Sequence, residues 1–114
     1  MKHGFWKVAC ATPKIKVADC SYNVNEMINI AKDASEKHVK VLVFPELCIT
    51  AYTCADMFFS NVLLDGAHKA LKKYIKETRE LDMLSVVGLP MFYENKIYNC
   101  AAVVKGGELL YLHK

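Results

Sequence analysis

Two kinds of apolar pattern alternate along the chain, short continuous blocks and longer periodic segments. The continuous blocks are residues 5–12, 41–44, 83–89, 97–104 and 108–113. Short apolar blocks bounded by turn-forming residues are typical of β-strands, and the unbroken run at 41–44 predicts a strand buried on both faces. Because proline has no backbone N–H, we expect the strands before Pro13, Pro45 and Pro90 to end there.

Two periodic segments predict amphipathic helices. Residues 21–37 and 66–81 each carry apolar side chains three or four positions apart, with charged residues between them. Asp19 or Asn23 could cap the start of the first helix, which connects two strands as a βαβ unit. The apolar residues 56–64 predict a loop that packs over the end of the preceding strand, where a site is expected.

Turn signals join the last three strands into hairpins. Gly106 and Gly107 suit the positive φ angles of a tight hairpin turn, and Glu94-Asn95 marks a second turn. The expected order is strand, helix, strand, loop, helix and three strands. This order predicts an α/β fold, with a mixed sheet and the helices on one of its faces.

Composition places the chain among globular proteins and narrows its partners. Its 114 residues suffice for one domain, and 54% apolar against 24% charged residues argue against disorder. The net charge is only +3, and basic residues are not interleaved with aromatic ones, so we expect no nucleic-acid partner. No apolar run approaches about 18 residues and the start lacks a signal peptide's apolar region, which predicts a cytoplasmic protein without a membrane partner.

The cysteines and histidines suggest neither a disulfide framework nor a metal site. The five cysteines are odd in number and lack C-x-x-C spacing, and the four histidines are scattered along the chain. We expect Cys10, Cys54 and Cys100 to be inert core residues, because they lie within apolar stretches.

Glu46 is the first candidate for chemistry, because it closely follows the strand predicted at 41–44. In open α/β sheets, sites form at the carboxyl ends of strands. A carboxylate held against the apolar side chains of Phe44, Leu47 and Ile49 suits a general base. A solvated glutamate that caps the next turn is an equally open interpretation.

The residues around Glu46 resemble a known family. The segment F-P-E-L, with an aromatic residue shortly after it, is similar to the first motif of the carbon-nitrogen hydrolase (nitrilase) superfamily. The longer pattern F-P-E-L-C-I-T-x-Y-T-C-x-D-x-F at residues 44–58 resembles, more narrowly, the amino-terminal glutaminase domain of glutamine-dependent NAD synthetases. Ala51 and Ala55 depart from the pattern, since glycine is usual there. Either alanine would strain the loop by about 1 kcal/mol or more if its φ had to be positive.

The resemblance implies a fold and a second catalytic residue. The family fold is an α-β-β-α sandwich, of which residues 1–114 would form a single incomplete domain, about one sheet with its helices. The inner face of that sheet would be apolar and uncovered. The family uses a Glu-Lys-Cys triad, so Glu46 takes the role of general base and Lys114, at the end of the last strand, that of the lysine. On position alone Lys114 is an exposed lysine, and His113 stands where the family usually has proline.

The reaction that the resemblance implies is the hydrolysis of glutamine to glutamate and ammonia. It needs a thiolate nucleophile, a base that takes its proton and returns it to the leaving ammonia, and a positive group for the oxyanion. In the family the nucleophilic cysteine follows the lysine, so we assign no nucleophile here, not even Cys48 near Glu46. The chain alone is expected to be inactive and to hold no cofactor. ATP and Mg²⁺ would serve a synthetase domain that amidates deamido-NAD in a homo-oligomeric intact protein.

Two other interpretations stay open. The chain could belong to another carbon-nitrogen hydrolase that acts on a small amide, nitrile or carbamoyl compound, although the longer pattern favours the synthetases. It could also be a truncated, non-catalytic module that binds a partner or oligomerises through its uncovered sheet. A stop codon after Lys114 in the natural gene would favour this last interpretation.

Overall fold

The computed structural model describes residues 6–16, 19–50 and 61–114, which form a single mixed sheet and two helices. The elements are β1 (Val8–Cys10), α1 (Cys20–Glu36), β2 (Val41–Val43), α2 (Asn61–Glu77), β3 (Leu84–Tyr93), β4 (Lys96–Lys105) and β5 (Glu108–His113). The strands lie in the order β1-β2-β3-β4-β5, with parallel pairing from β1 to β3 and antiparallel pairing from β3 to β5. The predicted element order and the mixed α/β sheet are confirmed.

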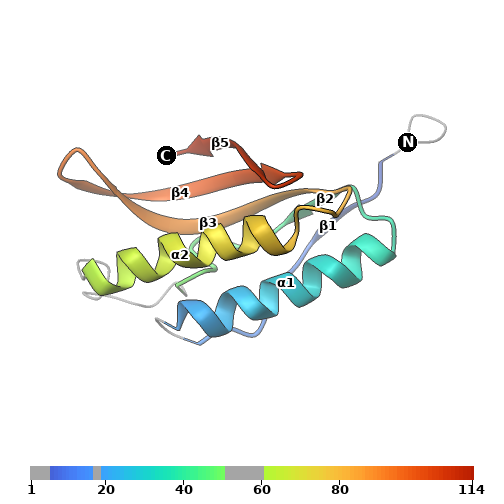
Figure 1. The fold of residues 1–114 in the computed structure, drawn as a ribbon, viewed down its shortest axis with the longest axis horizontal. Helices are drawn as coiled ribbons and strands as arrows, with labels where there is room; N and C mark the ends of the chain where they lie inside the picture. The colour runs from blue at the N-terminus through green and yellow to red at the C-terminus, as the bar shows by residue number, and fades with distance from the viewer. Residues whose placement is uncertain (1–5, 17–18, 51–60) are drawn as a thin grey trace.

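Both helices cover the same face of the sheet. Figure 1 shows α1 and α2 side by side beneath it, and the two helices contact each other. The ring of Tyr74 in α2 meets Phe44 edge to face at a centroid distance of 5.9 Å, and its hydroxyl donates to Ser85 of β3 at 2.7 Å. In the part of the chain that the structure describes, no helix is long and apolar enough to cross a membrane. The buried apolar residues of the helices are Cys20, Val24, Met27, Ile28, Ala31 and Ala34 in α1, and Leu63, Ala67, Ala70, Leu71 and Tyr74 in α2.

The opposite face of the sheet is apolar and uncovered by any described residue. Across this face, in register, lie Cys10, Val43, Val86, Val103 and Tyr111. Val43 is 37% exposed, whereas the neighbouring Leu42, which points at the helices, is 1% exposed. The prediction that this strand is buried on both faces is therefore wrong, because helices cover only one face. For the same reason Cys10 is exposed instead of lying in the core.

The first helix lies where the sequence predicts it, and the second is displaced. Helix α1 begins and ends one residue before its predicted bounds, and Asp19 caps it by accepting a hydrogen bond from the Tyr22 N–H at 3.0 Å. Helix α2 begins five residues earlier and ends four residues earlier than predicted. The buried Leu63 extends the stripe that continues at Ala67, four positions later, so packing of this side chain favours a helix through Gly66.

The segment predicted as a loop at 56–64 is consequently helical from Asn61 onward. The remainder of that loop lies outside the described residues, as do Ala51, Cys54 and Ala55.

Two predicted strands, β1 and β3, have different bounds in the structure. Strand β1 is shorter than predicted, with residues 1–5 outside the described part, and β3 continues through Pro90 to Tyr93. Strand β2 pairs with β3 only as far as Val86, so Pro90 lies where β3 has a neighbour on one side, opposite Asn99. Proline is tolerated at such an edge because no ladder partner needs its missing N–H.

The two predicted hairpins are confirmed. Strands β4 and β5 match their predicted bounds to within one residue. Both residues of each turn have positive φ, 47° and 64° at Glu94 and Asn95, and 61° and 83° at Gly106 and Gly107. Such turns match the twist of the paired strands, so they hold β3, β4 and β5 in register.

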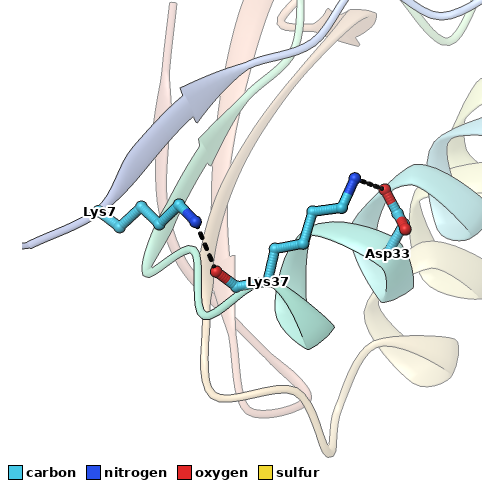
Figure 2. Close-up of polar contacts among 3 residues, drawn as sticks. All are labelled: Lys7, Asp33 and Lys37. Atoms are coloured by element: carbon cyan, nitrogen blue, oxygen red, sulfur yellow. Dashed lines mark hydrogen bonds and ion pairs between the residues drawn. The ribbon is translucent and has the colours of Figure 1, made fainter.

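A hydrogen bond from Lys7 joins the residue before β1 to the residue after α1. The ammonium of Lys7 donates to the backbone carbonyl of Lys37 at 2.9 Å, and the ammonium of Lys37 donates to Asp33 at 3.0 Å (Figure 2). A cation at this place satisfies a carbonyl that the helix leaves without a partner and complements the helix dipole. The contact adds a link between β1 and α1 to the backbone ladder that pairs β1 with β2.

Candidate active site

Glu46 lies in a tight turn directly after β2. The chain leaves the sheet at Pro45, and the N–H of Cys48 donates back to the Pro45 carbonyl at 3.2 Å. Leu47, next to the candidate base, has a φ of 53°. A residue with a Cβ pays about 1–2 kcal/mol for this left-handed conformation, and such strain persists only where surrounding contacts enforce it.

Contacts from two elements enforce the turn. From β3, the carbonyl of Gly88 accepts the Ile49 N–H at 3.1 Å, and the Gly88 N–H donates to the Cys48 sulfur at 3.5 Å. From α1, the side-chain amide of Asn23 donates to the Ile49 carbonyl at 2.9 Å. Asn23 is fully buried, so it anchors the turn and does not cap the helix.

Gly88 allows the turn to lie directly against β3. A Cβ on this residue would stand 2.5 Å from the Leu47 nitrogen, 2.8 Å from the Pro45 oxygen and 3.1 Å from the Glu46 carbonyl carbon. All three are backbone atoms, which cannot rotate away as a side chain can. The apolar pattern of the strand does not single out Gly88, although an isolated glycine within a strand is a known signal of close backbone approach.

The Glu46 carboxylate is exposed and accepts a hydrogen bond from the side-chain amide of Asn99 on β4. The prediction that apolar side chains surround this carboxylate is wrong. Phe44 and Ile49 are buried in the core, whereas Glu46 is exposed. Asn99 is also absent from the candidates that the sequence suggests. Its only signal there is an amide side chain within the otherwise apolar block 97–104.

Glu46 and Lys114 line the same hollow, whose volume is about 350 Å³. The Lys114 ammonium lies 4.8 Å from the ring centroid of Tyr93 and 4.9 Å from that of Tyr98. Of the ion pairs among the described residues, none joins Lys114 to Glu46. The structure thus brings both predicted site residues to one place, but it does not bring them into contact. The hollow is lined by Val43, Phe44, Pro45, Glu46, Val86, Val87, Gly88, Asn99, Cys100, Ala101, His113 and Lys114.

The thiols near this hollow are poorly suited to attack an amide. Burial raises the pKa of the Cys48 thiol from 9.0 to about 11. Burial also raises the pKa of Cys100, although the charge of Lys114 partly offsets that rise. A nucleophilic cysteine needs a lowered pKa, so neither residue fits the role. The described residues also contain no group of three or more His, Cys, Asp or Glu side chains that could hold a metal ion.

The carbon-nitrogen hydrolase family profile matches residues 7–114 of this chain. The chain belongs to the carbon-nitrogen hydrolase family. The match includes Glu46, Gly88, Asn99 and Lys114, and it confirms the resemblance seen at residues 44–58.

Relatives of this carbon-nitrogen hydrolase chain include synthetases. The glutamine-dependent NAD(+) synthetase of Mycobacterium tuberculosis is 31% identical over 109 residues, which are 96% of this chain and 16% of the relative. That of Aquifex aeolicus is 34% identical over 98 residues, covering 86% of this chain and 17% of the relative. The chain therefore spans about a sixth of the length of these relatives, in their amino-terminal part.

Solved structures agree on the fold of this carbon-nitrogen hydrolase chain. A crystal structure of a glutamine-dependent NAD(+) synthetase from Cytophaga hutchinsonii matches with a TM-score of 0.87 at 26% identity, over 94% of this chain and 18% of that one. An amidase from Nesterenkonia sp. matches with a TM-score of 0.75 at 20% identity, over 94% of this chain and 41% of that one. At the lower identity the likeness is one of fold alone.

Proposed function

We propose that this carbon-nitrogen hydrolase chain forms the amino-terminal part of a glutaminase domain. In the complete protein, that domain would hydrolyse glutamine to glutamate and ammonia for the ATP-dependent amidation of deamido-NAD. The observation that carries the proposal is a carboxylate, Glu46, held at the end of a parallel strand in a hollow that Lys114 shares. The match to glutamine-dependent NAD(+) synthetases over 96% of the chain supports the choice of glutamine.

Glu46 has the place and the chemistry of a general base. Its carboxylate would take the proton of a nucleophilic thiol and return it to the nitrogen of the leaving ammonia. An exposed position beside the hollow leaves it accessible to a substrate.

Lys114 would stabilise the negative charge that develops on the amide oxygen. To do so its ammonium has to turn away from Tyr93 and Tyr98. A cation–π contact at an exposed site is worth only about 0.5–1 kcal/mol, so this movement costs little compared with the stabilisation of an oxyanion.

The other parts of this machinery would come from residues beyond these 114. They include the nucleophilic cysteine, the second sheet of the α-β-β-α sandwich, and a synthetase domain that uses ATP and Mg²⁺. The uncovered apolar face with Val43 and Tyr111 fits a layer that packs against that second sheet. On this proposal the chain by itself is inactive, and no cofactor is assigned to its residues.

Glutamine hydrolysis by the natural protein that carries this chain tests the proposal. Its mass is compared first with the 12.9 kDa of the chain. Glu46→Gln and Lys114→Met should each lower kcat by about 100-fold or more, because each removes a group that acts on the transition state. Glu80→Gln and Lys72→Met, at exposed positions outside the hollow, are the matched controls and should leave kcat unchanged.

Three outcomes would contradict the proposal. The natural protein could end at Lys114 and release no ammonia, which would favour a binding module. It could hydrolyse other small amides but not glutamine, which would favour another member of the family. Or Glu46→Gln could retain the kcat of the unchanged protein, which would remove Glu46 as the base.

A further inference from the structure

We propose that Asn99 is a positioning residue, whose side-chain amide holds the Glu46 carboxylate in the orientation that proton transfer requires. This inference rests on the function proposed above, in which Glu46 is the base. It concerns a residue that no sequence motif marks and that β4 brings to the hollow from 53 positions away.

Glu46 needs such a partner because its surroundings leave it free to turn. Glu46 is exposed and lies in a turn, so packing restrains its side chain less than it restrains a core side chain. Within the described residues, Asn99 provides the hydrogen bond that the carboxylate accepts. Asn99 itself lies on β4, in register with Pro90 of β3, and a strand holds a side chain more rigidly than a loop does.

The chemistry of the amide suits this role. An ionised carboxylate can only accept hydrogen bonds, and an amide NH₂ can donate one without changing its own protonation. The bond from Asn99 can therefore fix the direction of one carboxylate oxygen without exchanging a proton with it.

The contact also gives the two carboxylate oxygens different roles. Asn99 holds Oε1, which leaves Oε2 to act. The S–H bond of the nucleophilic thiol breaks as an O–H bond forms at Oε2, and that proton later passes to the nitrogen of the leaving ammonia. Asn99 gains and loses no proton in either step.

The experiment measures glutamine hydrolysis by the complete natural protein with three substitutions at this position. Asn99→Leu keeps the size of the side chain and removes the donor, and it should lower kcat about 10- to 100-fold with KM changed by less than about threefold. Asn99→Asp replaces the donor with a second carboxylate and should lose at least as much. Asn99→Gln keeps an amide and should recover part of the lost kcat. Asn29→Leu, at an exposed position of α1, is the matched control and should behave as the unchanged protein.

A double variant separates positioning from general damage to the fold. If Asn99 acts through Glu46, adding Asn99→Leu to Glu46→Gln should lower kcat no further than Glu46→Gln alone. A further loss in the double variant would overturn the inference. So would an unchanged kcat in Asn99→Leu, or an equal loss in Asn99→Gln and Asn99→Leu. If instead Glu46→Gln itself keeps the parent kcat, the proposed function fails, and that result is distinct from a failure at Asn99.

Discussion

Replacing Gly88 by alanine should displace the turn that carries Glu46. The added Cβ would start 2.5 Å from the Leu47 nitrogen and 2.8 Å from the Pro45 oxygen. Both atoms belong to the backbone of a turn that is already hydrogen-bonded to β3 and α1. The clash therefore cannot be relieved by rotating a side chain, and either the turn or β3 has to move.

The size of the effect follows from these distances. Ordinary contact with a Cβ begins at 3.4 Å, so the closest atom must retreat from 2.5 Å by 0.9 Å. Overpacking of this kind costs about 1–3 kcal/mol of the free energy of unfolding. The same movement would weaken the hydrogen bond between the Ile49 N–H and the Gly88 carbonyl. If Glu46 is the base, a misplacement of about 1 Å is expected to lower kcat about 100-fold.

Three measurements on the complete natural protein check this prediction. Urea unfolding reports the loss of stability, amide hydrogen exchange at Ile49 reports the local loosening, and glutamine hydrolysis reports the effect on catalysis. Gly66→Ala is the control, and it should raise the free energy of unfolding where Gly88→Ala lowers it. Its Cβ would lie 3.6 Å from the Cys20 sulfur, an ordinary contact, and alanine is favoured over glycine in a helix by about 1 kcal/mol. A Gly88→Ala protein with unchanged stability, unchanged exchange at Ile49 and unchanged kcat would refute the reasoning.

Three further predictions concern two buried groups, the Cys48 thiol and the Tyr74 hydroxyl. Cys48, with a pKa raised to about 11, should resist iodoacetamide at pH 8 in the native protein and react after denaturation, and mass spectrometry that finds rapid native labelling would contradict this. Because the unfolded thiol releases its proton near 9.0, before the folded one does, stability should fall as the pH rises from 9 toward 11. Cys48 should contribute at most about 2–3 kcal/mol of this fall, so the fall should be smaller in Cys48→Ala when denaturant titrations of the two proteins are compared. Part of it should remain in both proteins, because burial also raises the pKa of Tyr74 and of Cys100. Tyr74→Phe should lower the free energy of unfolding by about 1–2 kcal/mol, because it removes the donor to the buried Ser85 hydroxyl. Adding Ser85→Ala to the Tyr74→Phe protein should lower the free energy of unfolding by less than Ser85→Ala lowers it in the unchanged protein. Full additivity in this double-mutant cycle would show that the two hydroxyls are not coupled.

The sequence by itself determined most of the elements and the family. The periodic segment that became α1, the hairpin turn at Gly106, and the run that became β2 are all recognisable from residues close together in the chain. A helix depends on side chains within about four positions and a hairpin on the residues of its turn, so local patterns suffice for both. The pattern at 44–58 likewise identified the family before any geometry was known.

The start of α2 and the end of β3 differ from the bounds that the sequence predicts, because they depend on contacts with other elements. Helix α2 starts at Asn61 and not at Gly66, because the burial of Leu63 against the other elements outweighs the low helix propensity of glycine. Strand β3 passes through Pro90 because β2 ends at Val43, so no strand on that side needs the N–H that proline lacks. The sequence of β3 does not reveal where β2 ends.

Only the tertiary structure decided how the candidate site is assembled. Asn99 meets Glu46 across 53 positions, and Gly88 meets the turn around Glu46 across about 40. Such contacts depend on the order and register of β2, β3 and β4 and on which face the helices cover. The apolar pattern of one helix or strand shows only which of its own sides is buried. It does not show which other element lies against that side. The sequence thus supplied the candidate base and its family, and the packing of the sheet brought the residues that contact it.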